Sequence, residues 1–249
     1  MTPRLDSFNN HNETTLELNL IQKISVFALP VLFAITLHEA AHGYAALKFG
    51  DRTAQLLGRI SLNPLRHVDL VGTIIVPLAI LLISKLSGGG GILFGWAKPV
   101  PVNFNQLRRP KQDMLWVAAA GPGANLLMAL IWAGLIKLAL ALSGSALATP
   151  LALMGAAGIF INAVLMALNL IPLPPLDGGR ILVSLLPTPL AIKVARIEPY
   201  GLFLLLGLMY LGILGRIMWP LIEAIITLAA YLFGLDPVKL LAFIQIVLN

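Results

Sequence analysis

Residues 20–47 read LIQKISVFALPVLFAITLHEAAHGYAAL. This stretch is long enough to cross a bilayer, because a hydrocarbon core of about 30 Å needs about 20 helical residues. It also carries two histidines and a glutamate in its second half. Ionisable groups at hydrocarbon depth are costly and mark functional candidates. The stretch therefore predicts a membrane-spanning helix that contains a functional site.

The composition of the whole chain supports a membrane protein. Of its 249 residues, 58% are hydrophobic and only 11% are charged, whereas an ordinary globular domain carries about 25% charge. This excludes a soluble enzyme, a disordered tail, a coiled coil and a nucleic-acid-binding domain. The chain has no cysteine, so any metal site must be built from His, Asp or Glu.

The apolar stretches predict about five to six transmembrane helices. They run over Leu20–Leu47, Leu70–Leu86, Met114–Leu142, Leu151–Leu176 and Pro199–Leu235. The last stretch is too long for one span, and Arg216 followed by Trp219-Pro220 predicts a turn that divides it in two. Residues 1–19 are expected to form a polar N-terminal segment, residues 20–235 the membrane-embedded domain and residues 236–249 a short C-terminal segment.

The distribution of Lys and Arg predicts the orientation of the chain. They gather in residues 48–69, 98–113 and 177–198, whereas residues 143–150 carry none. Basic loops stay in the cytoplasm, so these three segments and the C-terminus are expected inside and the N-terminus outside. We expect a multi-pass protein of the plasma or inner membrane, with its active site toward the cytoplasm.

This orientation leaves no room for a simple crossing by residues 70–86, because the segments before and after them are both expected inside. The stretch is followed by a glycine run at 88–91 and a proline-rich run at 94–103. Irregular backbone at membrane depth survives only against protein or a wet cavity. We therefore predict an α-helical integral membrane protein with a re-entrant, β-like hairpin near the active site.

The sequence His38-Glu39-Ala40-Ala41-His42 has the spacing of a zinc-hydrolase motif. Residues four apart share one face of a helix, so both imidazoles can reach one metal ion. Glu39 is placed to accept a proton from a metal-bound water. The alternative is a polar cluster that holds helices together.

A catalytic zinc ion takes three protein ligands and keeps a fourth position for water. Candidates for the third ligand are His67, Asp69, Asp177 and Glu223. Asp177 stands out because it ends the run NLIPLPPLDGGR at residues 169–180, where prolines break the helix and glycines allow close approach. The alternative is that Asp177 only caps a helix at 179–186.

The two motifs together resemble the site-2 protease family of intramembrane zinc metalloproteases, in the compact form without PDZ or CBS domains. Residues 120–125, AGPGAN, are similar to the start of that family's central helix. The resemblance implies one zinc ion held by His38, His42 and Asp177, with Glu39 as the catalytic base. It also implies that the Asn169 amide stabilises the oxyanion or holds the substrate backbone.

The expected function is hydrolysis of peptide bonds within or near transmembrane segments of membrane proteins, as in regulated intramembrane proteolysis. The expected partners are a transmembrane helix of a protein substrate and the lipid bilayer, with no nucleic acid; the sequence does not set the oligomeric state. Residues 100–102 are strand-like and can offer an edge to an extended substrate, or can be a surface loop. The alternatives are a non-catalytic metal-binding protein or transporter and a helix-binding pseudoprotease, and Glu39 argues against the latter.

Overall fold

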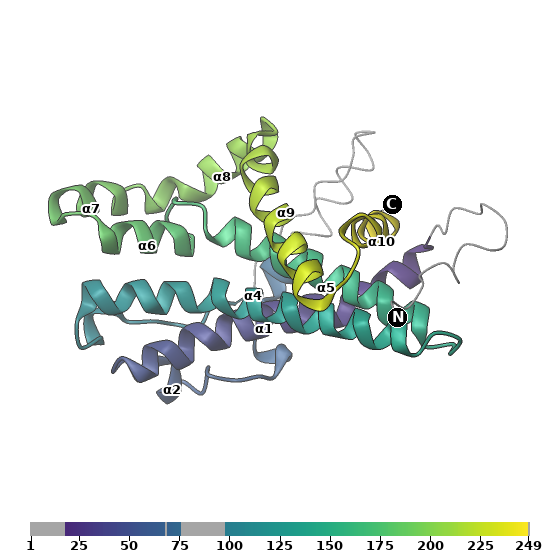
Figure 1. Cartoon of the computed structure of the whole chain (residues 1–249). Coiled ribbons are helices and arrows are strands. Elements are labelled where there is room, and N and C mark those ends of the chain that lie inside the picture. Colours follow the sequence, from purple (N-terminus) through teal and green to yellow (C-terminus); the bar gives the residue numbers. More distant parts are fainter. Residues whose placement is uncertain (1–17, 68, 76–97, 249) are drawn as a thin grey trace.

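The structure is a computed structural model that describes residues 18–67, 69–75 and 98–248 (Figure 1). Its helices are α1 (Leu20–Lys48), α2 (Thr53–Leu56), α4 (Pro110–Ala141), α5 (Ala148–Asn169), α6 (Asp177–Leu185), α7 (Thr188–Ala195), α8 (Gly201–Tyr210), α9 (Ile213–Phe233) and α10 (Pro237–Leu248). Short 3₁₀ turns lie at Pro64–Arg66, Phe104–Gln106 and Glu198–Tyr200, and a π-helical turn at Leu70–Ile75. The described residues contain no strand.

Four helices within the described residues are long and apolar enough to cross a membrane, namely α1, α4, α5 and α9. The protein is thus an α-helical integral membrane protein, as predicted. Most of the predicted re-entrant hairpin falls on residues 76–97, outside the described residues. The part that follows, residues 98–103, is irregular and pairs with no strand in the described chain.

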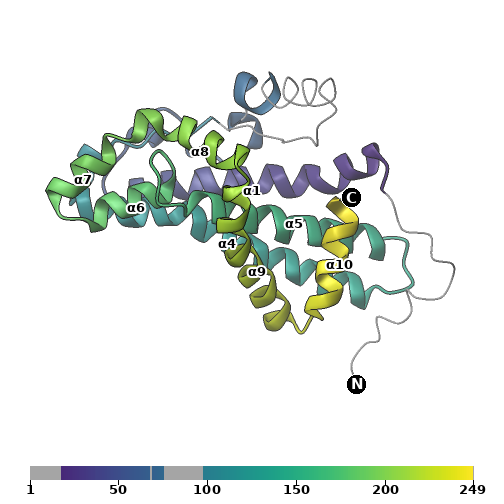
Figure 2. The same cartoon turned by 90° about the horizontal axis from the view of Figure 1, so that it is seen from above.

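Helices α1, α4 and α5 lie side by side and form the centre of the molecule (Figures 1 and 2). The most extensive contact joins α4 and α5, where Gly155 faces Ile136 and Gly158 faces Trp132. A Cβ atom on Gly158 would lie 2.6 Å from Cδ1 of Trp132. Small residues at such a crossing let two helix backbones meet, which is how helices associate in membranes.

The last apolar stretch turns at a different residue from the predicted one. The break falls at Gly212, whose φ of 68° is left-handed and suits glycine. It separates the 10-residue α8 from the 21-residue α9, and Pro220 lies inside α9. The prediction of a turn at Trp219-Pro220 is therefore wrong. Only one of the two helices is long enough to span.

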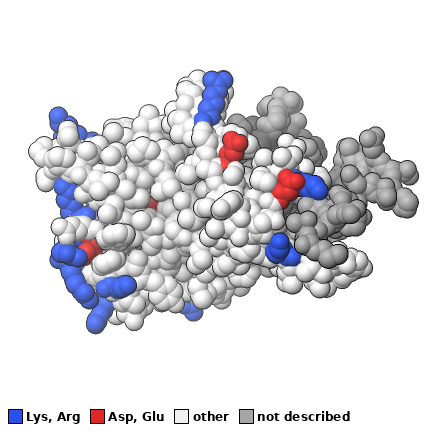
Figure 3. Space-filling view, in the orientation of Figure 1, with Lys and Arg blue, Asp and Glu red and all other residues white. Residues whose placement is uncertain are grey.

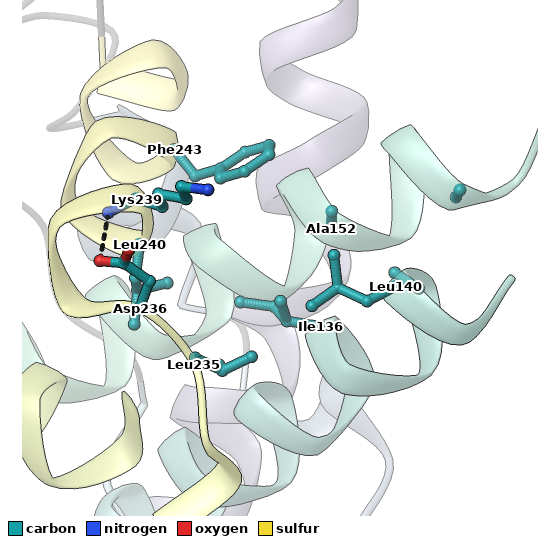
Figure 4. Close-up of a pocket in the computed structure, with 10 residues that line it drawn as sticks. Ile136, Leu140, Ala152, Leu235, Asp236, Lys239, Leu240 and Phe243 are labelled. Carbon is teal, nitrogen blue, oxygen red and sulfur yellow. Dashed lines mark hydrogen bonds between the residues drawn. The ribbon is translucent and has the colours of Figure 1, made fainter. Parts of the chain in front are cut away.

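Helix α9 crosses α5 obliquely, and α10 then packs against α5 and α9 (Figures 1 and 2). Where α10 begins, it leaves a cavity of about 20 Å³ beside the α4–α5 turn (Figure 4). Leu235 and Leu240 line this cavity together with Ile136, Ala148 and Ala152. The start of α10 thus lies at the same end of the bundle as residues 142–147. The charge distribution predicts this end to be outside, so the placement disagrees with the expected cytoplasmic C-terminal segment.

Exposed Lys and Arg side chains gather at the opposite end, where α1 ends and α4 begins (Figure 3). They include Lys48, Arg52, Lys98, Arg108, Lys111, Lys193 and Arg196. All come from the three basic segments of the sequence, so the fold brings these segments to one end of the bundle. The bias of Lys and Arg toward cytoplasmic loops predicts that this end faces the cytoplasm.

Candidate metal centre

Two histidines of α1 and the first residue of α6 meet in the interior. The Nε2 atoms of His38 and His42 are 3.1 Å apart. Oδ2 of Asp177 lies 3.2 Å from the Nε2 atom of His38 and 3.3 Å from that of His42. These atoms can hold one metal ion, and they form the single such group among the described residues. The side chains predicted as ligands are therefore brought together.

The position of Asp177 depends on the loop that follows α5. In this loop residues 170–176 fold back, and Gly178 and Gly179 lie against its backbone at Leu170, Ile171 and Pro174. A Cβ atom at either glycine would overlap these backbone atoms. The loop can fold this tightly only because both residues lack side chains.

The alternative role for Asp177, a cap on a helix at 179–186, does not hold. Helix α6 begins at Asp177 itself, its N-cap is Leu176, and no side chain caps it by a hydrogen bond. The carboxylate faces the two imidazoles instead.

The second nitrogen of each imidazole is held by α4. Nδ1 of His42 donates to the Val117 carbonyl at 2.7 Å, and Nδ1 of His38 lies 2.6 Å from Oδ1 of Asn125. A backbone carbonyl only accepts, so Nδ1 of His42 carries a proton, and in the neutral imidazole the lone pair is then on Nε2. Metal-binding histidines in proteins use this arrangement to fix the ring and its tautomer.

The centre contains an unpaired oxygen that a metal ion could bind. Oδ2 of Asp177 is buried and has no hydrogen-bond partner within the described part of the chain. Gly121 of α4 faces the imidazoles, and a Cβ atom there would lie 2.6 Å from Cε1 of His38. Glycine at position 121 thus keeps the imidazole atoms that face one another clear of a side chain, and two imidazoles with one carboxylate match the donor set of catalytic zinc.

Glu39 lies beside the centre and is bound by the segment after residue 97. Its Oε2 accepts a hydrogen bond from the Val100 N–H at 2.7 Å. The same segment is held at Asn103, whose N–H donates to the buried Asp51 at 2.7 Å. Sequence reasoning missed Asp51 and the Val100 amide, because nothing in the local pattern indicates which backbone groups approach α1.

Asn169 forms a hydrogen bond within its own helix. Its Nδ2 donates to the Leu165 carbonyl, one turn earlier in α5, at 3.0 Å. Its role in holding an oxyanion or substrate stays a prediction.

The other candidates for the third ligand lie elsewhere. Nε2 of His67 contacts the Ser61 carbonyl at 2.8 Å, Asp69 accepts from the Gly72 N–H at 2.7 Å, and Glu223 is exposed on α9. None of the three joins the group of metal-ligating side chains among the described residues.

The sequence model of peptidase family M50 matches residues 26–209, which include both histidines, Glu39 and Asp177. The chain belongs to peptidase family M50. This is the site-2 protease family, so the resemblance of the two motifs is confirmed.

Curated relatives agree with the M50 assignment. Over 199 residues the chain is 37% identical to "Putative zinc metalloprotease YwhC" of Bacillus subtilis, an overlap of 79% of this chain and 85% of the relative. Over 202 residues it is 25% identical to "Putative zinc metalloprotease Rip2" of Mycolicibacterium smegmatis, an overlap of 80% and 73%. No solved structure matches. Zinc is thus the metal of this family centre, as the sequence predicts.

Proposed function

We propose that this M50 chain is an intramembrane zinc endopeptidase that hydrolyses peptide bonds within or near transmembrane segments of membrane proteins. The observation that carries the proposal is the depth of the metal-ligating group in a helix long enough to span the bilayer. His38 lies about 15 Å from the end of α1, at 1.5 Å per residue. A centre at this depth suits a substrate that is itself in the membrane.

In this proposal Glu39 is the general base. A bound zinc ion would lower the pKa of its water and polarise the scissile carbonyl. The Val100 N–H occupies Oε2 of Glu39 and fixes the carboxylate, which leaves Oε1 to accept the water proton. Glu39 then returns this proton to the leaving amine.

Asn169 and residues 98–103 are the proposed substrate contacts. The Asn169 amide can serve an oxyanion or a substrate backbone group if it leaves the Leu165 carbonyl. Pro99 and Pro101 have no N–H, and the Val100 N–H is already used by Glu39. An extended substrate along Pro99–Pro101 therefore meets carbonyl acceptors, to which its own N–H groups would donate.

We place the active site in the cytoplasmic half of the plasma or inner membrane. The support is the gathering of exposed Lys and Arg at the end where α1 ends (Figure 3). His38 and His42 lie in the half of α1 nearer to this end. A substrate cut here would release its product on the cytoplasmic side, as regulated intramembrane proteolysis requires.

The test uses the full chain, purified and reconstituted into vesicles with zinc and a panel of single-span substrates. We expect cleavage within or near the spans, and loss of cleavage in Glu39→Gln with one zinc per chain retained, because Glu39 is not a ligand. Zinc binding without cleavage of any substrate would favour a metal-binding protein or transporter. Binding of helices without cleavage would favour a pseudoprotease.

A further inference from the structure

Two asparagines with no exposed surface connect the metal centre to the helix behind it. Asn125 lies on α4 and Asn162 on α5. Nδ2 of Asn125 donates to Oδ1 of Asn162 at 3.0 Å and lies 3.3 Å from the Ala34 carbonyl of α1. Nδ2 of Asn162 donates to the Gly158 carbonyl at 2.8 Å. The catalytic mechanism proposed above assigns no role to Asn162.

The direction of this hydrogen-bond chain is set at its far end. The Gly158 carbonyl only accepts, so Asn162 must present its NH₂ group to it and its oxygen to Asn125. Asn125 must then turn its NH₂ group toward Asn162, and the Ala34 carbonyl favours the same orientation. Oδ1 of Asn125 is thereby left facing Nδ1 of His38 at 2.6 Å.

This direction decides which nitrogen of His38 carries the proton. An oxygen at Nδ1 requires Nδ1–H, so in the neutral imidazole the lone pair is on Nε2, the atom that faces His42 and Asp177. A flipped Asn125 amide would point its oxygen at the Ala34 carbonyl and at the Asn162 oxygen. Both carbonyl groups would then lose a donor in a buried, low-dielectric place, where unpaired polar groups are most costly.

We propose that Asn162 is a positioning residue of the metal centre. Acting through Asn125, it holds His38 in the tautomer that presents Nε2 to zinc, although its own hydrogen bonds go to Asn125 and the Gly158 carbonyl and not to a ligand. The inference rests on the proposed zinc site but not on proteolysis. If the chain binds zinc but cleaves no substrate, the proposed proteolysis is refuted and this inference still stands.

The experiment measures zinc affinity of the purified full chain by competition with a chromophoric chelator, and the visible spectrum of the Co²⁺-substituted protein. Leucine has nearly the shape of asparagine and can make neither hydrogen bond. We expect Asn125→Leu and Asn162→Leu each to weaken zinc binding, by about tenfold or more for loss of such an outer contact. Both should also change the Co²⁺ spectrum.

The decisive comparison repeats Asn162→Leu in an Asn125→Asp background. An aspartate at 125 presents an oxygen to His38 whatever its neighbour does, so it no longer needs Asn162 to orient it. We expect the effect of Asn162→Leu on zinc affinity to shrink to less than about twofold there, against about tenfold in the native background. A purely structural role would lower affinity equally in both backgrounds.

Asp113→Asn is the matched control, because it alters another buried polar group of α4, near its start. It should leave zinc affinity unchanged. Asn162→Ala replaces Asn162→Leu if the larger side chain prevents folding. Unchanged zinc affinity and an unchanged Co²⁺ spectrum in the folded Asn162 variants would overturn the inference, as would equal losses in the two backgrounds.

Discussion

Gly121 lies directly against His42: a Cβ atom at position 121 would overlap the Nε2 atom of His42, closer than real Cβ atoms approach other atoms. The same atom would lie 2.7 Å from Nε2 of His38. The hydrogen of this glycine thus borders the space between the two imidazoles. Helix α4 therefore shapes the metal centre in two ways: it has no side chain at position 121, and it forms hydrogen bonds to both histidines.

Replacement of this glycine should empty the centre. In Gly121→Ala the methyl group would displace the imidazoles or occupy the space of the ion, so we expect loss of most bound zinc and of activity. The measurement is zinc per chain by elemental analysis of purified protein, with substrate cleavage alongside.

Gly123→Ala is the control for that variant. Position 123 is on the same helix, and nothing lies within 4 Å of a Cβ atom there. This variant should keep its zinc and gain up to about 1 kcal/mol of helix stability. Full zinc occupancy in Gly121→Ala would contradict the packing around the histidines.

Loss of the carboxylate ligand should reduce zinc and activity together. We expect Asp177→Ala to lower metal occupancy and cleavage in parallel, because two imidazoles alone bind the ion more weakly. Glu223→Ala removes an exposed carboxylate of α9 and should change neither quantity. If Asp177→Ala keeps full zinc and full activity, the ligand assignment is wrong and His67 becomes the next candidate.

The amide of Val100 should affect turnover and leave zinc binding unchanged. Val100→Pro deletes the N–H that binds Glu39, so we expect kcat to fall by about tenfold or more, which is part of the roughly 10²–10⁴-fold that a positioned general base contributes. Val100→Ala keeps the N–H and should retain most of the activity. The two variants are compared by steady-state cleavage at equal zinc content. Equal rates would show that the amide does not orient Glu39.

The topology can be read with single cysteines, since the chain has none of its own. Cysteines at the exposed positions 109, 146 and 238 are labelled with an impermeant thiol reagent in intact and lysed cells. We expect 146 and 238 to label from outside, because α10 begins beside the α4–α5 turn, and 109 only after lysis. External labelling at 109 would reverse the proposed orientation of the active site.

The sequence predicts the centre well because its ligands obey local rules. Because His38 and His42 are four residues apart, the helix period places them on one face. The prolines before Asp177 predict a break in the helix. Asn162 could not be found this way. Its importance comes from a contact between α4 and α5, and no periodicity shows which buried amide faces which.

The C-terminal part of the fold, helices α8 to α10, is the part that the sequence predicts least well. Pro220 is tolerated within α9, whereas the chain turns at Gly212. Both residues can break a helix, and a sequence alone does not rank them when neighbouring helices are unknown. The side on which α10 begins likewise depends on how α9 crosses α5, which loop charges do not encode.

The ligands of the centre come from distant parts of the chain, and this gives the ion a second consequence. His42 and Asp177 are separated by more than half of the sequence, and a shared zinc ion would tie α1 to the start of α6 as a cross-link does. Such a cross-link lowers the conformational entropy of the unfolded chain, and the effect grows slowly with the length of the closed loop. Removal of the ion by a chelator would therefore weaken the attachment of α6 and its loop to the bundle. The metal centre would then stabilise the fold as well as carry the reaction.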